Sequence, residues 1–376
     1  MTDDHRPLLS VRDLQVRFPV STDRGKGVVQ AVAGIDFDIH RGQTVSLVGE
    51  SGSGKSTVAN ALMHLVEPSA GTVLLDGKDI TSVRGRELKA LRRRIAMVFQ
   101  DPFASLDPRQ HVSRAVAEPP EVHGLGGDKD GRRRRVEELF ELVGLSRRFL
   151  DRYPHELSGG QRQRVSIARA LAGEPDLIIL DEATASLDVS VQAQIMNLLN
   201  RLQGELGLTY LFIAHDLAVV EHMSDHVLVM YLGRLMEDGG VRDVFDAPAH
   251  PYTKALLASA PSADPVAERR RRTAPLKGEV PSPLDPPSGC VFRTRCPWAA
   301  DECARTVPEP VPPPGAPSAP PEARRAPREH VAACIRLPEV QASTRGTSRP
   351  VRSATGPAGP ARPSTARRAP WAGPGA

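Results

Sequence analysis

The chain has 376 residues, 40% of them hydrophobic and 25% charged, so it can bury a sizeable core, and we expect two or three domains. No run approaches the roughly 18 consecutive apolar residues of a membrane helix. The first residues, Met1–Pro7, lack the apolar core of a signal peptide, so we expect the chain to stay in the cytoplasm.

The formal net charge of +4 is concentrated at the C-terminus. Residues 338–376 hold six arginines against Glu339, a local balance of +5 that leaves −1 for the other 337 residues. The folded part is therefore not basic, which argues against a charge-driven nucleic-acid surface. Residues 339–376 are mostly Pro, Ala, Gly, Ser and Arg, and we expect a disordered basic tail, with weak contact to a membrane surface as the alternative.

The first predicted elements are strands at residues 8–18 and 29–39, followed by an apolar strand at 44–48. That strand runs directly into a glycine-rich stretch, and residues 57–65 are expected to form the helix after it. The stretch matches the phosphate-loop pattern G-x-x-x-x-G-K-[ST], in which backbone N–H groups surround phosphate oxygens at a helix N-terminus. The predicted nucleotide-binding residues are Gly49, Glu50, Ser51, Gly52, Ser53, Gly54, Lys55, Ser56 and Thr57.

Further strands are predicted at 71–80 and 94–100, and from 101 to about 171 the pattern becomes helical. Short, fully apolar strands follow at the positions 177–180, 210–214 and 227–231, alternating with helices such as 189–206. This alternation indicates an α/β fold with a buried parallel sheet.

Two acidic residues, Asp181 and Glu182, directly follow the apolar strand 177–180. A carboxylate fixed at a strand end suits Mg²⁺, for which the Ser56 hydroxyl is a second ligand, while Lys55 would reach the β and γ phosphates. Glu182 has the chemistry of a base that polarises an attacking water molecule.

Residues 157–161 read Leu-Ser-Gly-Gly-Gln, which resembles the signature of ATP-binding cassette (ABC) ATPases. The resemblance implies an ABC-type P-loop NTPase: a RecA-like core with an antiparallel β subdomain and a helical subdomain at about 101–171. In that family the signature completes the nucleotide site of a partner subunit in a head-to-tail dimer. The residues that would contribute to the partner's site are Ser158, Gly159, Gly160 and Gln161.

The same resemblance assigns roles to four further residues. It implies that Gln100 contacts Mg²⁺ or water and faces the membrane subunits, and that His215 senses the γ-phosphate. It places Asp188 in a loop that contacts the dimer partner, and Phe18 against adenine, although a phenylalanine at a strand end is also an ordinary core residue. One departure is visible: residues 182–188 read Glu-Ala-Thr-Ala-Ser-Leu-Asp, whereas many relatives read Glu-Pro-Thr-Ser-Ala-Leu-Asp. The register is unchanged, so we expect ATPase activity to persist.

Four stretches narrow the resemblance to the ATPase subunits of dipeptide and oligopeptide importers, namely residues 99–108, 153–161, 250–257 and 281–297. The likeness covers about residues 8–337 and is greatest to the second of two paired ATPases. It implies peptide import together with a second ATPase subunit, two membrane permeases and an extracytoplasmic peptide-binding protein.

 On this resemblance the chain would lie on the cytoplasmic face of the cell membrane as a peripheral subunit.

The sequence leaves other functions open. A nickel importer, a regulatory cassette, or an ABC ATPase that acts on DNA or ribosomes would carry the same nucleotide motifs. Gln100 and Ser158 are only 58 positions apart, which leaves no room for the long coiled-coil insertion of DNA-repair members. Ribosome-acting members usually carry two cassettes, and this chain has one phosphate loop. No nucleic-acid partner is therefore expected.

All four cysteines lie near the C-terminus, at the positions Cys290, Cys296, Cys303 and Cys334. Their spacing is not the paired C-x₂-C of a zinc ribbon, and disulfides are disfavoured in a reducing cytoplasm. Spacing alone leaves zinc, an iron–sulfur cluster and buried thiols equally open. The importer resemblance favours a 4Fe-4S cluster, because relatives with this tail hold one.

The expected domain organisation follows from these shifts in composition. Residues 1–259 form the ABC ATPase domain, 260–287 a linker, 288–338 a compact cysteine segment and 339–376 the tail. The cysteine segment is too small to bury much of a core unaided, so we expect it to use a staple or the surface of the main domain.

Overall fold

The computed structural model describes residues 6–22, 25–101, 103–185, 187–259, 278–314 and 329–342. Its strands are β1 (Leu9–Thr22), β2 (Gly25–Ile39), β3 (Thr44–Val48), β4 (Ala70–Leu75), β5 (Lys78–Asp79), β6 (Ile95–Val98), β7 (Leu177–Asp181), β8 (Thr209–Ala214), β9 (His226–Tyr231), β10 (Arg234–Gly240) and β11 (Val331–Ala332). The α-helices are α1 (Lys55–Leu62), α2 (Gly85–Arg94), α3 (Val112–His123), α4 (Lys129–Leu142), α5 (Gly159–Leu171), α6 (Val189–Leu206), α7 (Leu217–Met223), α8 (Val241–Asp246), α9 (Pro251–Ser259) and α11 (Leu337–Ala342). Three short 3₁₀ helices span Arg147–Phe149, Pro154–Glu156 and Asp301–Ala304.

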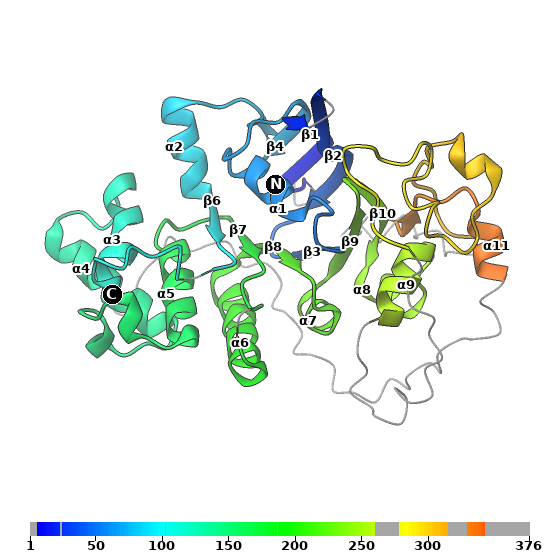
Figure 1. The fold of residues 1–376 in the computed structure, drawn as a ribbon. Coiled ribbons are helices and arrows are strands. Elements are labelled where there is room, and N and C mark those ends of the chain that lie inside the picture. Colours follow the sequence, from blue (N-terminus) through cyan, green and yellow to red (C-terminus); the bar gives the residue numbers. More distant parts are fainter. Residues whose placement is uncertain are drawn as a thin grey trace.

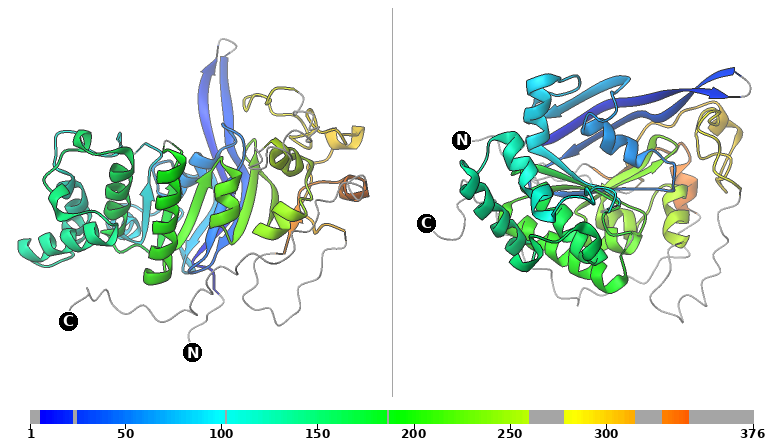
Figure 2. Two further views of the ribbon diagram at one scale, coloured as in Figure 1. Left: turned by 90° about the horizontal axis from the view of Figure 1, so that it is seen from below. Right: turned by 60° about the vertical axis from the view of Figure 1, so that its left-hand side comes forward.

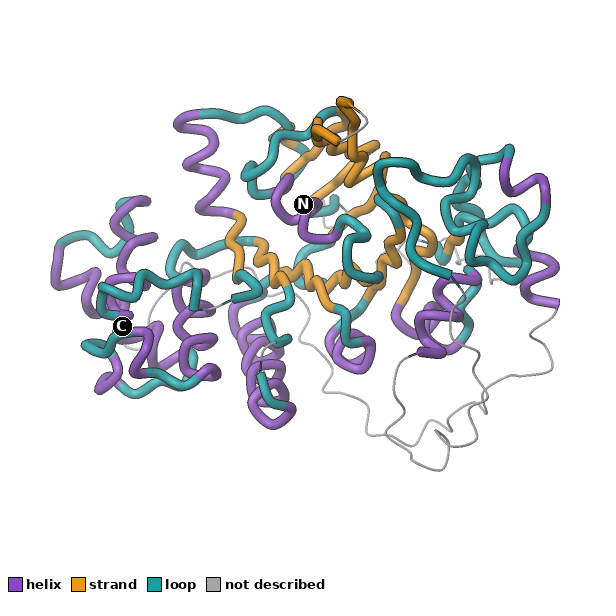
Figure 3. Tube along the Cα trace, in the orientation of Figure 1, coloured by secondary structure: helices purple, strands orange, loops and turns teal. Residues whose placement is uncertain are grey.

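The larger sheet has the strand order β11-β10-β9-β3-β8-β7-β6, and its five strands from β9 to β6 are parallel. Figure 3 draws the strands in orange, with helices beside them. Strands β3, β7, β8 and β9 are buried along their whole length, as expected for parallel strands that are covered on both faces. The phosphate-loop strand β3 lies between β8 and β9. The carboxyl ends of these parallel strands therefore share one edge, where α/β proteins bind ligands.

Alternate side chains of the central strands enter two different cores. In β7, Leu177 and Ile179 pack with α1 and the N-terminal strands, whereas Ile178 and Leu180 pack with the helices on the opposite face. Figure 1 shows this arrangement, with α1 and the antiparallel strands above the sheet and α6, α7, α8 and α9 below it. This is the period of two that a strand imposes on its side chains.

The second sheet is antiparallel, with the order β2-β1-β4-β5. It supplies the antiparallel subdomain that was predicted, and its long β1–β2 hairpin extends away from the main sheet (Figure 2). Helices α3, α4 and α5 make up the helical region at the β6 end of the main sheet, and the cysteine segment lies at the other end (Figure 2).

Several predicted boundaries move by a few residues. Helix α1 starts at Lys55 and ends at Leu62, and β6 ends at Val98, so Gln100 lies just beyond its strand. Within the described part of the chain, no helix is long and apolar enough to cross a membrane.

The cysteine segment is built onto the main domain. Its strand β11 pairs antiparallel with β10, and Cys290, Phe292 and Cys303 share a core with the main sheet. Helix α11 runs past the predicted boundary at residue 338, because Val340 is fully buried. The predicted tail therefore cannot start at residue 339. The rest of the tail, from 343, and residues 260–277 of the predicted linker lie outside the described residues.

Candidate functional site

The phosphate loop connects the buried strand β3 to α1, and two of its glycines have backbone conformations that other residues rarely adopt. Gly49 has φ +154° and Gly54 has φ +108°. A Cβ atom would lie 2.1 Å from the Met230 carbonyl oxygen at the first position and 2.2 Å from the Ala31 carbonyl oxygen at the second. Neighbouring backbone thus requires glycine at both ends of the loop. Ser51, Gly52 and Ser56 are exposed, which leaves the loop open to a ligand.

Lys55 is folded back onto the loop, with its side chain almost completely buried. Its Nζ donates hydrogen bonds to the carbonyl oxygens of Gly49 and Glu50, both at 2.9 Å, and to Ser53 Oγ at 3.3 Å. Burial lowers the pKa of Lys55, and nearby carboxylates oppose that shift. The ammonium group is therefore held by weak neutral acceptors, which phosphate oxygens can replace with stronger, charge-assisted bonds.

Asp181 is the last residue of β7 and faces α1. Ser56 Oγ donates to Asp181 Oδ1 at 3.2 Å, so the two predicted Mg²⁺ ligands are neighbours. Burial raises the pKa of Asp181, and the adjacent Glu182 charge acts in the same direction. A buried carboxylate beside a hydroxyl fits Mg²⁺, which prefers oxygen ligands and relieves the cost of burying the negative charge.

Glu182 is brought together with two other predicted catalytic residues. Gln100 Nε2 donates to Glu182 Oε2 at 2.7 Å, and His215 Nδ1 lies 3.6 Å from the same oxygen. The three residues follow β6, β7 and β8, whose carboxyl ends are adjacent in the sheet. Glu182 has φ +45°, and its N–H donates to the carbonyl of Ile213, which holds the strained backbone in place.

The signature residues form the start of α5. Ser158 caps this helix: its Oγ accepts from the N–H of Gln161, and the Gln161 side chain accepts from the N–H of Ser158. A Cβ on Gly160 would lie 2.6 Å from Val191 Cγ1, so the signature helix packs closely on α6. Asp188 caps α6 by accepting from the N–H of Val191 at 2.9 Å.

The signature and the Asp188 loop are therefore neighbours, whereas α5 lies apart from α1 in Figure 1. Gly159 is half-buried and would place a Cβ 3.4 Å from a Leu187 methyl group. Thr57 is half-buried in α1. Phe18 is half-buried in β1 and packs against the N-terminal core, and nothing in its packing distinguishes a contact with adenine from a core role.

All four cysteines are free thiols and line one small pocket of about 10 Å³. Burial raises the pKa of Cys296 to about 12 and that of Cys334 to about 11, so these two thiols stay protonated at neutral pH. The walls include Phe292 and Trp298. Among the described residues, no three His, Cys, Asp or Glu side chains are grouped closely enough to hold a metal ion. The number of thiols fits a four-thiolate site, but their arrangement here does not form one.

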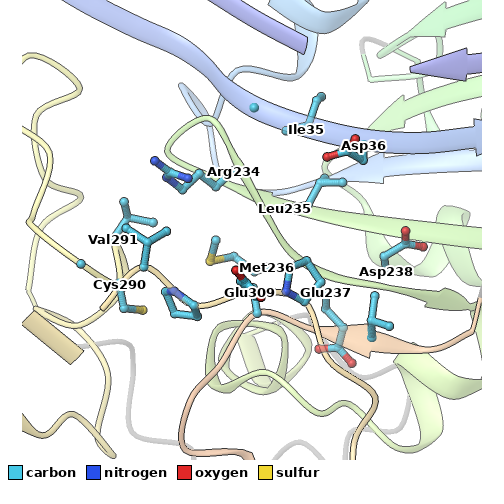
Figure 4. Close-up of a pocket in the computed structure, with 17 residues that line it drawn as sticks. Ile35, Asp36, Arg234, Leu235, Met236, Glu237, Asp238, Cys290, Val291 and Glu309 are labelled. Atoms are coloured by element: carbon cyan, nitrogen blue, oxygen red, sulfur yellow. The ribbon is translucent and has the colours of Figure 1, made fainter. Parts of the chain in front are cut away.

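A larger cavity of about 280 Å³ lies where the cysteine segment meets β10 and β2 (Figure 4). Cys290 and Val291 approach Met236 on one side, and Asp36 of β2 lies across from them (Figure 4). Glu237 of β10 is buried and accepts from the N–H groups of Ala249 and His250. Its carboxylate is therefore already engaged by the turn that precedes α9.

Sequence reasoning missed one contact at the phosphate loop. Arg295 of the cysteine segment forms an ion pair with Glu50, and the Glu50 N–H donates to the hydroxyl of Tyr252 at 2.9 Å. No local pattern signals a contact between residues 245 positions apart.

Family models match two parts of the chain. Residues 32–185 match the model described as ABC transporter, and residues 236–303 match the one described as oligopeptide/dipeptide transporter, C-terminal region. The chain is 51% identical to the putative oligopeptide transport ATP-binding protein YkfD of Bacillus subtilis, over 81% of this chain and 91% of the relative. It is 48% identical to the oligopeptide transport ATP-binding protein OppF of Salmonella typhimurium, over 81% of this chain and 93% of the relative.

Solved structures show the same fold. CbiO1 of Clostridium perfringens, part of an ABC transporter complex, aligns with a TM-score of 0.57 and 34% identity over 64% of this chain and 91% of its own. The ATP-binding cassette MJ0796, a dimer bound to ADP and Pi, aligns with a TM-score of 0.56 and 31% identity over 62% of this chain and 99% of its own.

Proposed function

This chain belongs to the ATP-binding subunits of ABC transporters, in the branch with an oligopeptide/dipeptide transporter C-terminal region, and we propose that it hydrolyses ATP to drive peptide import. The observation that carries the proposal is the presence of both features in one folded chain: a complete phosphate loop and the peptide-importer C-terminal region. The two relatives YkfD and OppF are designated for oligopeptide transport, so nickel, DNA and ribosomes are not favoured.

At the ATP site, the loop N–H groups and Lys55 would bind the β and γ phosphates. Mg²⁺, bound by Ser56 and Asp181, would neutralise charge on those phosphates. Glu182 would orient the attacking water, and its hydrogen bond from Gln100 fixes the carboxylate at the sheet edge. His215, whose Nδ1 lies 3.6 Å from that carboxylate, would contact the γ-phosphate. Hydrolysis would thus depend mainly on positioning and charge stabilisation.

The working unit would be a head-to-tail dimer. The exposed Ser158 and the neighbouring Asp188 loop are candidates for contact with the partner's ATP, since α5 lies apart from this chain's own α1 (Figure 1). The MJ0796 cassette is a dimer bound to ADP and Pi, which supports a dimeric working unit. The remaining partners in the proposal are a second ATPase subunit, two membrane permeases and an extracytoplasmic peptide-binding protein, with the chain on the cytoplasmic face of the membrane.

Co-purification followed by transport assay tests the import proposal. The tagged full-length chain should recover two permeases and a second ATPase, and the complex in vesicles should take up peptides only with ATP and the binding protein. Recovery of ribosomes or DNA without permeases would refute the proposal. A matched comparison of dipeptides, longer peptides and nickel complexes would identify the transported class.

We also propose a 4Fe-4S cluster at the four cysteines. Its support is that all four cysteines line one pocket. Among the described residues the side chains are not grouped closely enough to hold a metal ion, so the thiols would have to move together when a cluster binds. An iron–sulfur cluster needs thiolates, so binding would have to overcome the raised pKa values of Cys296 and Cys334. Protein purified without oxygen should be brown and contain iron and acid-labile sulfide. A colourless sample without iron would refute the cluster, and zinc in its place would establish the alternative.

A further inference from the structure

Arg295 reaches from the cysteine segment to the phosphate loop. Its Nη1 donates to Glu50 Oε2 at 2.7 Å, and its Nη2 donates to Glu50 Oε1 at 3.2 Å, which makes a bidentate pair. The arginine side chain is only 7% exposed, and its guanidinium carbon lies 5.8 Å from the centre of the Tyr231 ring. A shielded, two-point contact of this kind holds both side chains in one geometry.

Glu50 is fixed at three points. Its N–H donates to the Tyr252 hydroxyl, its carbonyl accepts from Lys55 Nζ, and its carboxylate pairs with Arg295. The residue follows directly after Gly49, the first glycine of the loop. Movement of Glu50 would therefore also displace its own carbonyl oxygen, which accepts a hydrogen bond from Lys55, the lysine that would bind the phosphates.

The Glu50 charge also acts on the site. The Glu50 carbonyl accepts from Lys55 Nζ at 2.9 Å, so the Glu50 carboxylate belongs to a residue in direct contact with the lysine that would bind the phosphates. Without a cation beside it, this carboxylate would be an unpaired negative charge in a loop that binds a triphosphate.

We propose that Arg295 is a positioning residue of the ATP site, which fixes Glu50 and cancels its charge toward the triphosphate. The inference rests on the ATP-hydrolysing function proposed above. It makes the cysteine segment a working part of the nucleotide site in its own chain.

The principal test is Arg295→Met, which keeps an unbranched side chain against Tyr231 but removes the charge. The dissociation constant of Mg-ATP for the full-length chain should rise roughly tenfold, which corresponds to about 1.4 kcal/mol. In the assembled transporter, KM for ATP should rise while kcat at saturating ATP stays nearly unchanged. A purely structural defect would instead lower the melting temperature and the fraction of active protein.

Removing the charge that Arg295 balances should restore binding. The double variant Glu50→Gln with Arg295→Met has no unpaired carboxylate, so its affinity for ATP should exceed that of Arg295→Met alone. Arg295→Lys should lie between Arg295→Met and the parent. Arg293→Met is the matched control, because among the described residues the Arg293 side chain donates hydrogen bonds to Ser288, at 2.9 and 3.3 Å, and to no residue of the phosphate loop, so its loss should leave ATP affinity unchanged.

Parental ATP affinity in Arg295→Met would overturn the inference. So would an equal loss of affinity in the double variant, since the unpaired charge would then not be the cause. If Arg295→Met does not fold, the ATP affinity of Arg295→Lys is compared with that of the parent. The ATP affinity of the double variant is then compared with that of Glu50→Gln. A parent chain that binds no ATP would overturn the proposed function as well, whereas normal binding by parent and variant would overturn this inference alone.

Discussion

Phe292→Ala should detach the cysteine segment from the main domain without unfolding that domain. The Phe292 side chain is fully buried, and its ring centre lies 5.4 Å from that of Tyr231, 5.3 Å from Tyr252 and 5.9 Å from His250. It is thus the aromatic residue of the segment that packs into the cluster next to the phosphate loop.

The size of the effect follows from burial. Truncation of a buried phenylalanine to alanine costs about 3–5 kcal/mol. If that cost falls on the opening of the segment, the open population rises roughly a hundredfold to several thousandfold, because each 1.4 kcal/mol is a factor of ten. Opening exposes Arg293 and Arg295, both of which are trypsin sites.

Limited trypsin digestion with mass spectrometry measures this opening. When closing is faster than cleavage, the cleavage rate follows the open population, so cleavage after Arg293 and Arg295 should accelerate by that factor. Phe140→Ala in α4 of the helical region removes an equally buried ring, so it is the matched control and should leave these two sites protected. Acceleration of less than about threefold in Phe292→Ala would refute the reasoning that this ring anchors the segment.

Two further predictions concern the acidic residues at the end of β7. Glu182→Gln should bind ATP normally but slow hydrolysis by about 10²–10⁴-fold, because the amide still accepts the Gln100 hydrogen bond but cannot act as a base. Single-turnover hydrolysis measures this rate. Undiminished turnover would remove Glu182 from its role. Asp181→Asn should raise the melting temperature at pH 7 in EDTA while abolishing Mg²⁺-dependent hydrolysis. Burial raises the pKa of Asp181, so the ionised carboxylate destabilises the folded protein at pH values above that raised pKa. The increase in melting temperature caused by Asn should therefore disappear as the pH falls to about 4, where the carboxyl group of the unfolded chain is also protonated. An equal gain at pH 4 and pH 7 would contradict this explanation.

The glycine conformations of the phosphate loop and the meeting of the strand-end residues could be predicted from sequence because their signals are local, whereas the roles of those residues stay predictions. The glycine spacing of residues 49–56 is set by backbone conformation, and both φ values and close carbonyl contacts at Gly49 and Gly54 agree with it. Glu182 and His215 each directly follow an apolar strand, so the parallel sheet alone was enough to bring them together.

The contacts of the C-terminal part could not be predicted in this way. The pairing of Arg295 with Glu50 depends on how the segment folds back over the sheet, which no periodicity encodes. The two-residue strand β11 is too short to give an alternating pattern. Val340 was assigned to the tail because the surrounding composition is polar and proline-rich, although a single buried side chain is enough to fix the end of α11.

The pairing of β11 with β10 also bears on the solubility of the protein. Strand β11 covers the outer edge of β10, with Val331 opposite Asp238 and Ala332 opposite Glu237. A chain shortened at Ser259 would leave the backbone N–H and C=O groups of that edge open to strands of other molecules. It would also uncover the buried apolar surface around Tyr252. The shortened ATPase domain should therefore self-associate and precipitate, even though its phosphate loop is intact.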